Sequence, residues 1–301
     1  MTPLPTWLRQ LAEIPGATDV LIASGRCQIE RGKGLENVDL VLPPAAELEA
    51  DLRRLALELG VRLDIAHPIA DAMLGKTRLH FVMPHGISES ASVSVRIHPA
   101  TPMTLEELVQ SSMMTRRQAD YLVSEFSERK TILISGPTGS GKTTLLRALL
   151  DSVGGRTIAI EQTPELHLDW PAVNLRSRAA NVEGIGEISL NDLVVAALRM
   201  RPDRIVIGEA RQDEFGAFLQ AVNNGHPGSA TTIHATSLDA VPRRLVTLGL
   251  LAGLSPELTG NLVLAGVDLV VQLDRDPNRH LVAIGVPIAD DSGFKIVRES
   301  K

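Results

Sequence analysis

The sequence predicts an α/β fold, in which a doubly wound, mostly parallel sheet carries a phosphate loop and a smaller α+β domain precedes it. From Ile132 onward, short apolar runs alternate with helix-like segments, which is typical of parallel strands joined by crossover helices. The first hundred residues instead mix short strand-like and helix-like segments without that regular alternation. We therefore expect an N-terminal α+β domain over residues 1–100, an interdomain linker over 101–115 and a sheet domain over 116–301.

Length and composition limit the possible classes of protein. A chain of 301 residues with 44% apolar residues is expected to form two globular domains. The net charge of −6 argues against general nucleic-acid binding, and the single cysteine, Cys27, excludes an internal disulfide. No apolar run approaches the ~18 residues that cross a bilayer. We expect a cytoplasmic protein that meets a membrane only through a partner.

The first domain is predicted to begin with a β-hairpin, because strand-like residues 19–23 and 28–30 flank a Ser24-Gly25 turn. Leucines at 48, 52, 55 and 59 have helical spacing, which predicts an amphipathic helix over 45–59 that Gly60 closes. Further strands are expected at 38–42, 61–65, 78–83 and 92–97. In the linker, Thr104 and Glu107 have the spacing of a capping box.

The second domain is predicted from its alternating elements. Strands are expected at 131–135, 157–160, 205–207 and 230–233, and helices at 118–126, 143–150, 189–200 and 213–222. Two later strands, 269–273 and 281–286, are predicted to extend the sheet in the antiparallel direction.

A phosphate loop of the form G-x-x-x-x-G-K-[ST] lies between the first of these strands and its helix. Its glycines let backbone N–H groups point at a triphosphate, and the helix N-terminus adds partial positive charge. Lys142 is expected to pair with the outer phosphates and the Thr143 hydroxyl to ligate Mg²⁺. The predicted nucleotide contacts are Gly136, Pro137, Thr138, Gly139, Ser140, Gly141, Lys142, Thr143 and Thr144.

Three carboxylates follow predicted strands. Ligands of open α/β sheets bind beyond the carboxyl ends of the strands, so these carboxylates are expected to lie on the ligand side of the sheet. Glu209 follows strand 205–207 and is expected to hold Mg²⁺ or to orient the attacking water. Glu161 and Glu165 follow strand 157–160, and either is a candidate to accept the proton of the attacking water. The alternative for each is a solvated loop carboxylate.

Histidines and arginines complete the predicted site. His226 and His234 bracket the strand at 230–233, and we interpret them as sensors of the γ-phosphate. Zinc is not indicated, because no third ligand stands at a recognised spacing. Arg176 and Arg178 are two apart in an extended segment, so both point to one side, where they suit an anion of a neighbouring subunit. Six arginines lie within the 36 residues from 176 to 211: Arg176, Arg178, Arg199, Arg201, Arg204 and Arg211.

Taken together, these motifs resemble those of the secretion-superfamily ATPases, the motors of type II and type IV secretion and of type IV pili. Residues 198–211 are similar to the family's Walker B segment, 225–235 to its histidine box and 160–166 to its aspartate box. Residues 175–178 and 181–184 resemble the arginine-bearing stretch of the tight-adherence (Flp pilus) branch. Gln162 stands where the family usually has Asp, which moves the predicted base to Glu165.

The resemblance implies a RecA-like ATPase domain and a homo-hexameric ring that binds ATP and Mg²⁺. Arg96, before the linker, and Arg211, at the end of the Walker B segment, are expected to contact the nucleotide. The ATPase would power tight-adherence pilus assembly or protein secretion through inner-membrane platform proteins, from the cytoplasmic face and without direct nucleic-acid binding. The alternatives are a conjugal or type IV secretion ATPase and a nucleotide-gated scaffold with little turnover.

Overall fold

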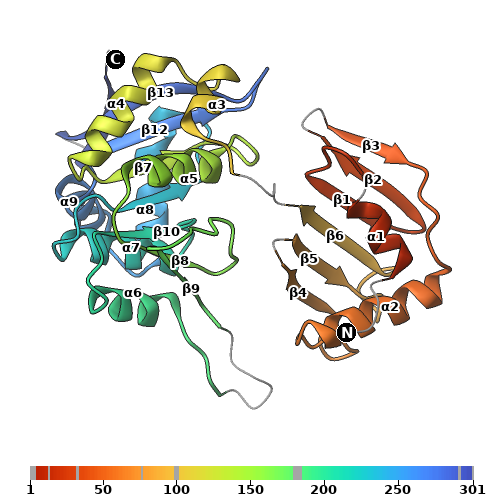
Figure 1. The fold of residues 1–301 in the computed structure, drawn as a ribbon. Coiled ribbons are helices and arrows are strands. Elements are labelled where there is room, and N and C mark those ends of the chain that lie inside the picture. The colour runs from red at the N-terminus through yellow and green to blue at the C-terminus, as the bar shows by residue number, and fades with distance from the viewer. Residues whose placement is uncertain are drawn as a thin grey trace. The chain divides into compact units, whose positions relative to one another are not determined.

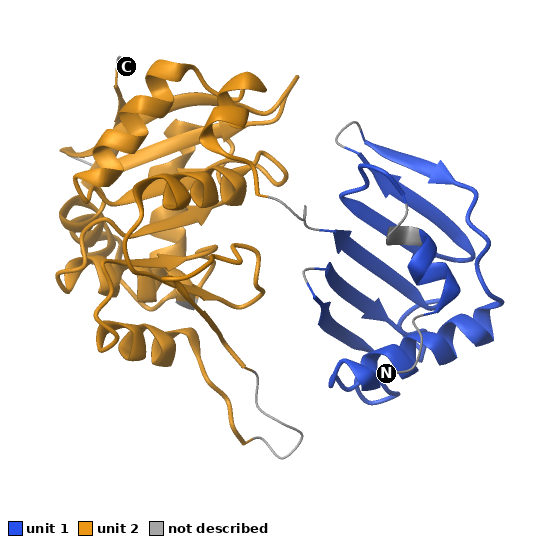
Figure 2. Ribbon diagram, in the orientation of Figure 1, with its two compact units in different colours: residues 1–101 blue, residues 102–301 orange. Residues whose placement is uncertain are grey.

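The computed structural model describes residues 5–12, 14–31, 34–75, 77–97, 102–178, 185–290 and 293–299. The chain forms two compact units, residues 1–101 and 102–301 (Figures 1 and 2). The predicted domain boundary after residue 100 and the segment 181–184 lie outside the described residues.

The first unit is a six-stranded antiparallel sheet with two helices. Its strand order is β3-β2-β1-β6-β5-β4. The two helices and the sheet share one core, in which Trp7, Leu52, Phe81 and Cys27 are buried. The elements are α1 (Thr6–Ala12), β1 (Asp19–Ala23), β2 (Arg26–Glu30), β3 (Leu35–Val38), α2 (Ala45–Glu58), β4 (Ile69–Leu74), β5 (Thr77–Val82) and β6 (Ser92–Ile97).

The predicted hairpin and the predicted helix of this unit are confirmed as β1–β2 and α2, and two predicted strands are wrong. The strand expected at 38–42 lies earlier, as β3. Residues 61–65 form no strand, because the Asp64 carboxylate accepts the N–H groups of Ala66 and His67, both at 2.9 Å, and turns the chain. The next strand, β4, therefore begins only at Ile69.

The second unit is an eight-stranded sheet with helices on both faces, and the predicted α/β fold class is confirmed. Its strand order is β14-β13-β12-β7-β11-β10-β8-β9. The strands are β7 (Ile132–Ser135), β8 (Thr157–Glu161), β9 (Val173–Arg176), β10 (Arg204–Ile207), β11 (Ala230–Ile233), β12 (Leu269–Asp274), β13 (His280–Asp290) and β14 (Gly293–Arg298). The helices are α3 (Leu105–Gln110), α4 (Arg116–Ser127), α5 (Lys142–Val153), α6 (Leu190–Leu198), α7 (Asp213–Asn223), α8 (Val241–Leu251) and α9 (Pro256–Gly266).

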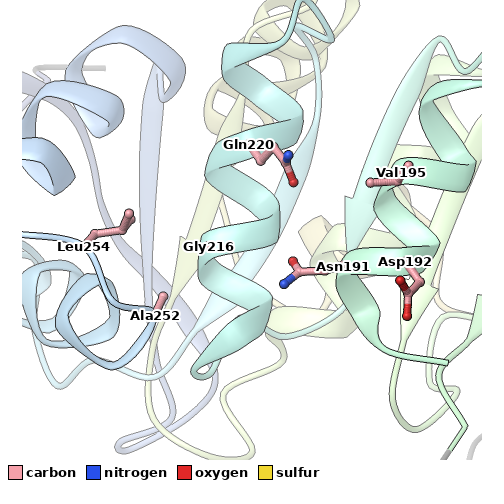
Figure 3. A pocket seen from close by; sticks show the side chains of 7 residues that line it. All are labelled: Asn191, Asp192, Val195, Gly216, Gln220, Ala252 and Leu254. Atoms are coloured by element: carbon pink, nitrogen blue, oxygen red, sulfur yellow. The ribbon is translucent and has the colours of Figure 1, made fainter. Parts of the chain in front are cut away.

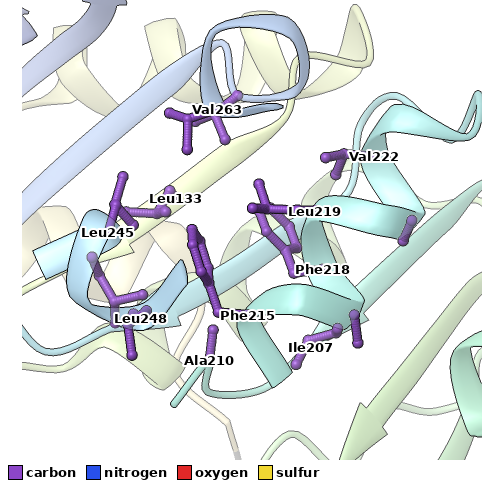
Figure 4. Packing of buried hydrophobic residues seen from close by; sticks show 14 of the residues in the cluster. Leu133, Ile207, Ala210, Phe215, Phe218, Leu219, Val222, Leu245, Leu248 and Val263 are labelled. Atoms are coloured by element: carbon purple, nitrogen blue, oxygen red, sulfur yellow. The ribbon is translucent and has the colours of Figure 1, made fainter. Parts of the chain in front are cut away.

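Each face of this sheet has its own apolar core. Helices α6 to α9 contribute to the first core, where Phe215 and Phe218 of α7 pack against Leu245 and Val263 (Figure 4). Helices α3, α4 and α5 contribute to the second. Before α3, the Thr104 side chain accepts the N–H of Glu107, so the predicted capping box is confirmed.

The predicted direction of one strand is wrong. β12 pairs with β7 in parallel, and antiparallel pairing begins only with β13. Helices α8 and α9 carry the chain back across one face of the sheet, and a strand that follows such a crossover runs parallel to its neighbour. The carboxyl end of β12 therefore lies at the same edge as that of β7, beside the phosphate loop.

Within the described ranges no single helix is long and apolar enough to span a membrane. One bent pair, Leu238–Leu251 with Pro256–Gly266, passes by length and composition, with a bend of 117°.

Candidate active site

The phosphate loop joins the buried strand β7 to the helix α5, as the sequence indicates. A side chain at Gly136 would bring a Cβ within 2.7 Å of the Leu273 carbonyl oxygen, so the first position of the loop requires glycine. Gly141, the N-cap of α5, has φ +93°, which only glycine adopts readily. These constraints fix the curvature of the loop.

Lys142 is buried inside the loop that it follows. Its ammonium donates to the carbonyl oxygens of Gly136 (3.0 Å) and Pro137 (2.9 Å) and lies 3.4 Å from Nδ1 of His234. Burial lowers the pKa of Lys142, and the nearby charges of Glu209 and Glu165 partly offset this. Its charge is therefore held by backbone dipoles that a phosphate oxygen could replace.

Glu209 follows β10 and lies in an ion cluster beside Lys142. One carboxylate oxygen is 3.0 Å from Nε2 of His234, and Arg211 binds the carboxylate with two bonds of 3.1 Å. Burial raises the pKa of Glu209, but the hydrogen bonds from His234 and Arg211 outweigh burial and lower that pKa to about 2. Glu209 is therefore ionised at any physiological pH.

Glu161 and Glu165, both candidates for the base, occupy different environments. The Thr143 hydroxyl donates to Glu165 at 3.2 Å. Glu161 is buried and accepts the backbone N–H groups of Glu165 (3.1 Å) and Leu166 (3.3 Å). Burial raises the pKa of Glu161 to about 7, and these two hydrogen bonds partly oppose that rise. Glu161 thus supports the loop that carries Glu165.

The structure does not bring His226 to this site. β11 runs parallel to β7, so the residues before β11 lie at the opposite edge of the sheet from the phosphate loop. A Cβ at Gly228 would lie 3.0 Å from the Cα of Arg129, which precedes β7 at that opposite edge. Only His234, at the carboxyl end of β11, stands level with Lys142.

Of the other predicted arginines, Arg176 and Arg178 lie on the surface of the second unit, and Arg96 belongs to the first unit. Arg176 is exposed and ends the edge strand β9, in register with Glu161. Arg178 is exposed and donates to the Gly186 carbonyl oxygen at 2.8 Å. Arg96, in the first unit, donates to Asp19 at 2.9 Å.

Sequence reasoning missed two buried polar side chains that hold the site. Arg147 of α5 donates to the carbonyl oxygens of Leu166 and His167, and so fixes the loop after β8. Gln272, near the end of β12, bonds to Ser135 at 2.5 Å and so links β12 to the start of the phosphate loop. A polar residue within an otherwise apolar strand or helix was the available signal for both.

The residues present fit a magnesium nucleotide. Ser140 Oγ is buried in the phosphate loop and finds no hydrogen-bond partner among the described residues. The Thr143 hydroxyl lies beside a carboxylate, the oxygen-donor chemistry that Mg²⁺ prefers. The described part of the chain contains no group of three or more metal-ligating side chains.

Two grooves lie in the second unit, and neither is lined by a predicted site residue. One, of about 420 Å³, lies between α6, α7 and the end of α8, where Asn191, Gln220 and Leu254 face it (Figure 3). The other, of about 440 Å³, lies beside Met113 and Leu281.

A phosphate loop between β7 and α5, with carboxylates at the carboxyl ends of neighbouring parallel strands, defines a P-loop ATPase. Residues 73–286 match the family described as Type II/IV secretion system protein. The chain belongs to this family.

Named relatives of the chain are consistent with membership of this family. The chain is 36% identical over 292 residues to a putative conjugal transfer protein of Mycobacterium tuberculosis, covering 93% of this chain and 83% of the relative. It is 32% identical over 264 residues to the conjugal transfer protein TrbB of Rhizobium radiobacter, covering 85% and 78%. The pilus retraction motor PilT, solved with bound ADP, has the same fold, with a TM-score of 0.62, 20% identity and coverage of 98% and 82%.

The predicted superfamily and the ATPase activity are therefore confirmed. The relatives favour the conjugal or type IV secretion alternative over the tight-adherence branch, which none of these comparisons supports specifically.

Proposed function

We propose that the protein is the ATPase motor of a conjugal or type IV secretion system and hydrolyses ATP at the site around Lys142. The observation that carries this proposal is the convergence of Lys142, His234 and Glu209, which follow three different strands: His234 lies within hydrogen-bond range of both Lys142 and Glu209. Such convergence at a phosphate loop suits charge stabilisation in phosphoryl transfer.

Each residue has a proposed role. Lys142 exchanges its backbone carbonyl partners for the outer phosphates, and Thr143 would hold Mg²⁺, which would neutralise phosphate charge when it is bound. Glu165 acts as the general base, because it is only half-buried and lies beside Thr143, whereas Glu161 is buried and its carboxylate accepts two backbone N–H groups. Glu209 would help to hold Mg²⁺ through water, with Arg211 beside it.

His234 is proposed to sense the phosphates. Its Nδ1 faces the Lys142 ammonium, and its Nε2 faces Glu209, which requires the neutral ring to carry its proton on Nε2. When the Lys142 ammonium turns to a phosphate, Nδ1 of His234 loses the ammonium as its hydrogen-bond donor. The hydrogen bond between Nε2 of His234 and Glu209 then changes. The nucleotide state is thereby passed to the segment after β11.

The test is phosphate release by purified protein and its Lys142→Ala variant. We expect kcat/KM to fall at least about 100-fold. Lys130→Ala is the matched control, because Lys130 lies before the same strand at its other end, in a half-exposed pair with Asp268. Loss of activity in the control, or full activity in Lys142→Ala, contradicts the proposal.

We further propose that the active form is a hexameric ring in which the exposed Arg176 and Arg178 reach the nucleotide of a neighbouring subunit. A closed ring supplies every site with such a neighbour. Mixing Lys142→Ala with Arg176→Ala/Arg178→Ala should restore part of the activity, since some interfaces then combine an intact phosphate loop with intact arginines. No recovery in mixed rings excludes the role in trans.

The proposed setting is the cytoplasmic face of the membrane, where platform proteins receive the motion. Plasmid transfer should be lost in a strain that carries only the Lys142→Ala form. Tight-adherence pilus assembly is the second candidate, favoured by the segment 175–178, and loss of surface pili with normal plasmid transfer would select it.

A further inference from the structure

The segment from Gln272 to Leu281 lies along the outer side of the phosphate loop, although it is more than 130 residues away in sequence. β12 has an irregular register at Gln272 and Leu273, which turns the end of the strand. The Leu273 carbonyl packs on Gly136, and Gln272 bonds to Ser135. The start of the loop is therefore set by β12.

Two arginines continue this contact along the loop. Arg275 donates to the carbonyl oxygen of Thr138 at 3.3 Å, and Arg279 donates to that of Gly139 at 2.9 Å. The segment that carries them is anchored at both ends. At its start, the Ser135 hydroxyl donates to the Gln272 side chain at 2.5 Å.

At the far end of the segment, the N–H of Leu281 donates to the Met113 carbonyl at 2.7 Å. The Met113 side chain in turn packs on Gly141, since a Cβ there would lie 2.9 Å from Met113 Cε. The loop thus has a continuous outer wall, from Gly136 to Gly141.

The direction of these hydrogen bonds matters for anion binding. In a phosphate loop the N–H groups point inward to the ligand, so an outward carbonyl belongs to a peptide plane whose N–H points inward. A guanidinium that binds the carbonyl holds the plane in that orientation. Two arginines on the phosphate loop also add positive potential, which favours polyphosphate.

We propose that Arg275 and Arg279 are positioning residues that hold the phosphate loop in its anion-accepting conformation. They set the affinity for the polyphosphate part of the nucleotide and leave the rate of the chemical step unchanged. This inference rests on the proposed function, in that the loop around Lys142 binds ATP.

The test is titration calorimetry with two probes, ADP and inorganic tripolyphosphate, on the full chain. We expect Arg275→Ala and Arg279→Ala each to raise both dissociation constants about 3- to 10-fold, as loss of one solvent-exposed hydrogen bond would. The double variant should raise them further, with KM for ATP rising in parallel and kcat at saturating ATP within about 2-fold of the unsubstituted protein. Arg298→Ala, which removes an exposed arginine of β14, is the control and should change neither.

Four outcomes overturn the inference. Unchanged dissociation constants in the double variant would do so, as would a fall in kcat with constant KM. A rise in the dissociation constant for ADP, with that for tripolyphosphate unchanged, would show that the arginines contact the nucleoside instead of positioning the loop. If the alanine variants unfold, the test uses Arg275→Lys/Arg279→Lys, which keeps both charges. This variant should bind both probes more weakly than the unsubstituted protein, because it lacks the two guanidinium hydrogen bonds. An affinity equal to that of the unsubstituted protein would contradict a role for these bonds. Failure of the unsubstituted protein to bind either probe contradicts the proposed function itself.

Discussion

The parallel strands of the eight-stranded sheet have a buried positive charge at each end, and the two charges have different partners. We call these two sides of the sheet the amino-terminal edge and the carboxyl edge, after the strand ends that lie there. At the amino-terminal edge, Arg204 donates to the carbonyl oxygens of Gly154 (2.9 Å) and Phe126 (3.0 Å), and its guanidinium stacks 4.9 Å from the Phe126 ring centre. At the carboxyl edge, Lys142 donates to carbonyls of its own loop, in which the buried Ser140 hydroxyl has no hydrogen-bond partner among the residues that the structure describes.

The partners of the two buried cations indicate that the amino-terminal edge has a structural role and the carboxyl edge a role in catalysis. Phe126 and Gly154 are at the ends of α4 and α5, so Arg204 ties two helices to β10 with partners that no ligand replaces. The partners of Lys142 are replaceable by phosphate oxygens. We therefore expect substitutions at the carboxyl edge to remove activity and those at the amino edge to remove stability.

The largest expected effect at the carboxyl edge is that of Glu165→Gln. Loss of the proposed base should lower kcat about 100- to 1,000-fold, with ATP affinity and melting temperature little changed. Phosphate release and nucleotide titration measure both quantities. Activity near that of the unsubstituted protein would remove Glu165 from the mechanism.

At the amino edge, Arg204→Leu should lower the free energy of unfolding by about 2–4 kcal/mol, because it removes a charged donor from the Gly154 and Phe126 carbonyls and the guanidinium contact with the Phe126 ring. Denaturant unfolding measures this, and kcat below the unfolding transition should stay within a few-fold. A variant of normal stability that no longer hydrolyses ATP would break the distinction between the edges.

Glu161→Gln tests the buried carboxylate that accepts the N–H groups of Glu165 and Leu166 at the carboxyl edge. Its folded-state pKa of about 7 lies above the ordinary 4.5, so the stabilisation from its protonated form is complete below about pH 4.5 and is lost as pH rises through 7. The stability of the unsubstituted protein should therefore fall relative to Glu161→Gln between pH 5 and 8, by about 2–3 kcal/mol. Parallel stability profiles would contradict this environment for Glu161.

The smallest effect is expected from Arg129→Ala, which removes a half-exposed ion pair with Asp203 at the amino edge. Such pairs contribute less than about 1 kcal/mol. Unfolding and phosphate release should both be nearly unchanged, and a large loss of either would show that this edge also has a functional role.

Local sequence determined much of the fold. The apolar runs of β7, β8, β10 and β11 and the glycine pattern of the phosphate loop depend on neighbouring residues, and their positions were predictable. Capping boxes are equally local, as at Thr104. Strand-end reasoning also predicted that Glu209 and His234 would meet near Lys142.

Tertiary structure decided the rest, because contacts between distant segments leave no periodic signal. Only the fold distinguishes Glu165, beside Thr143, from the buried Glu161, and only strand direction separates His226 from His234. The crossover through α8 and α9 made β12 parallel to β7, and that direction is what places Arg275 and Arg279 against the phosphate loop.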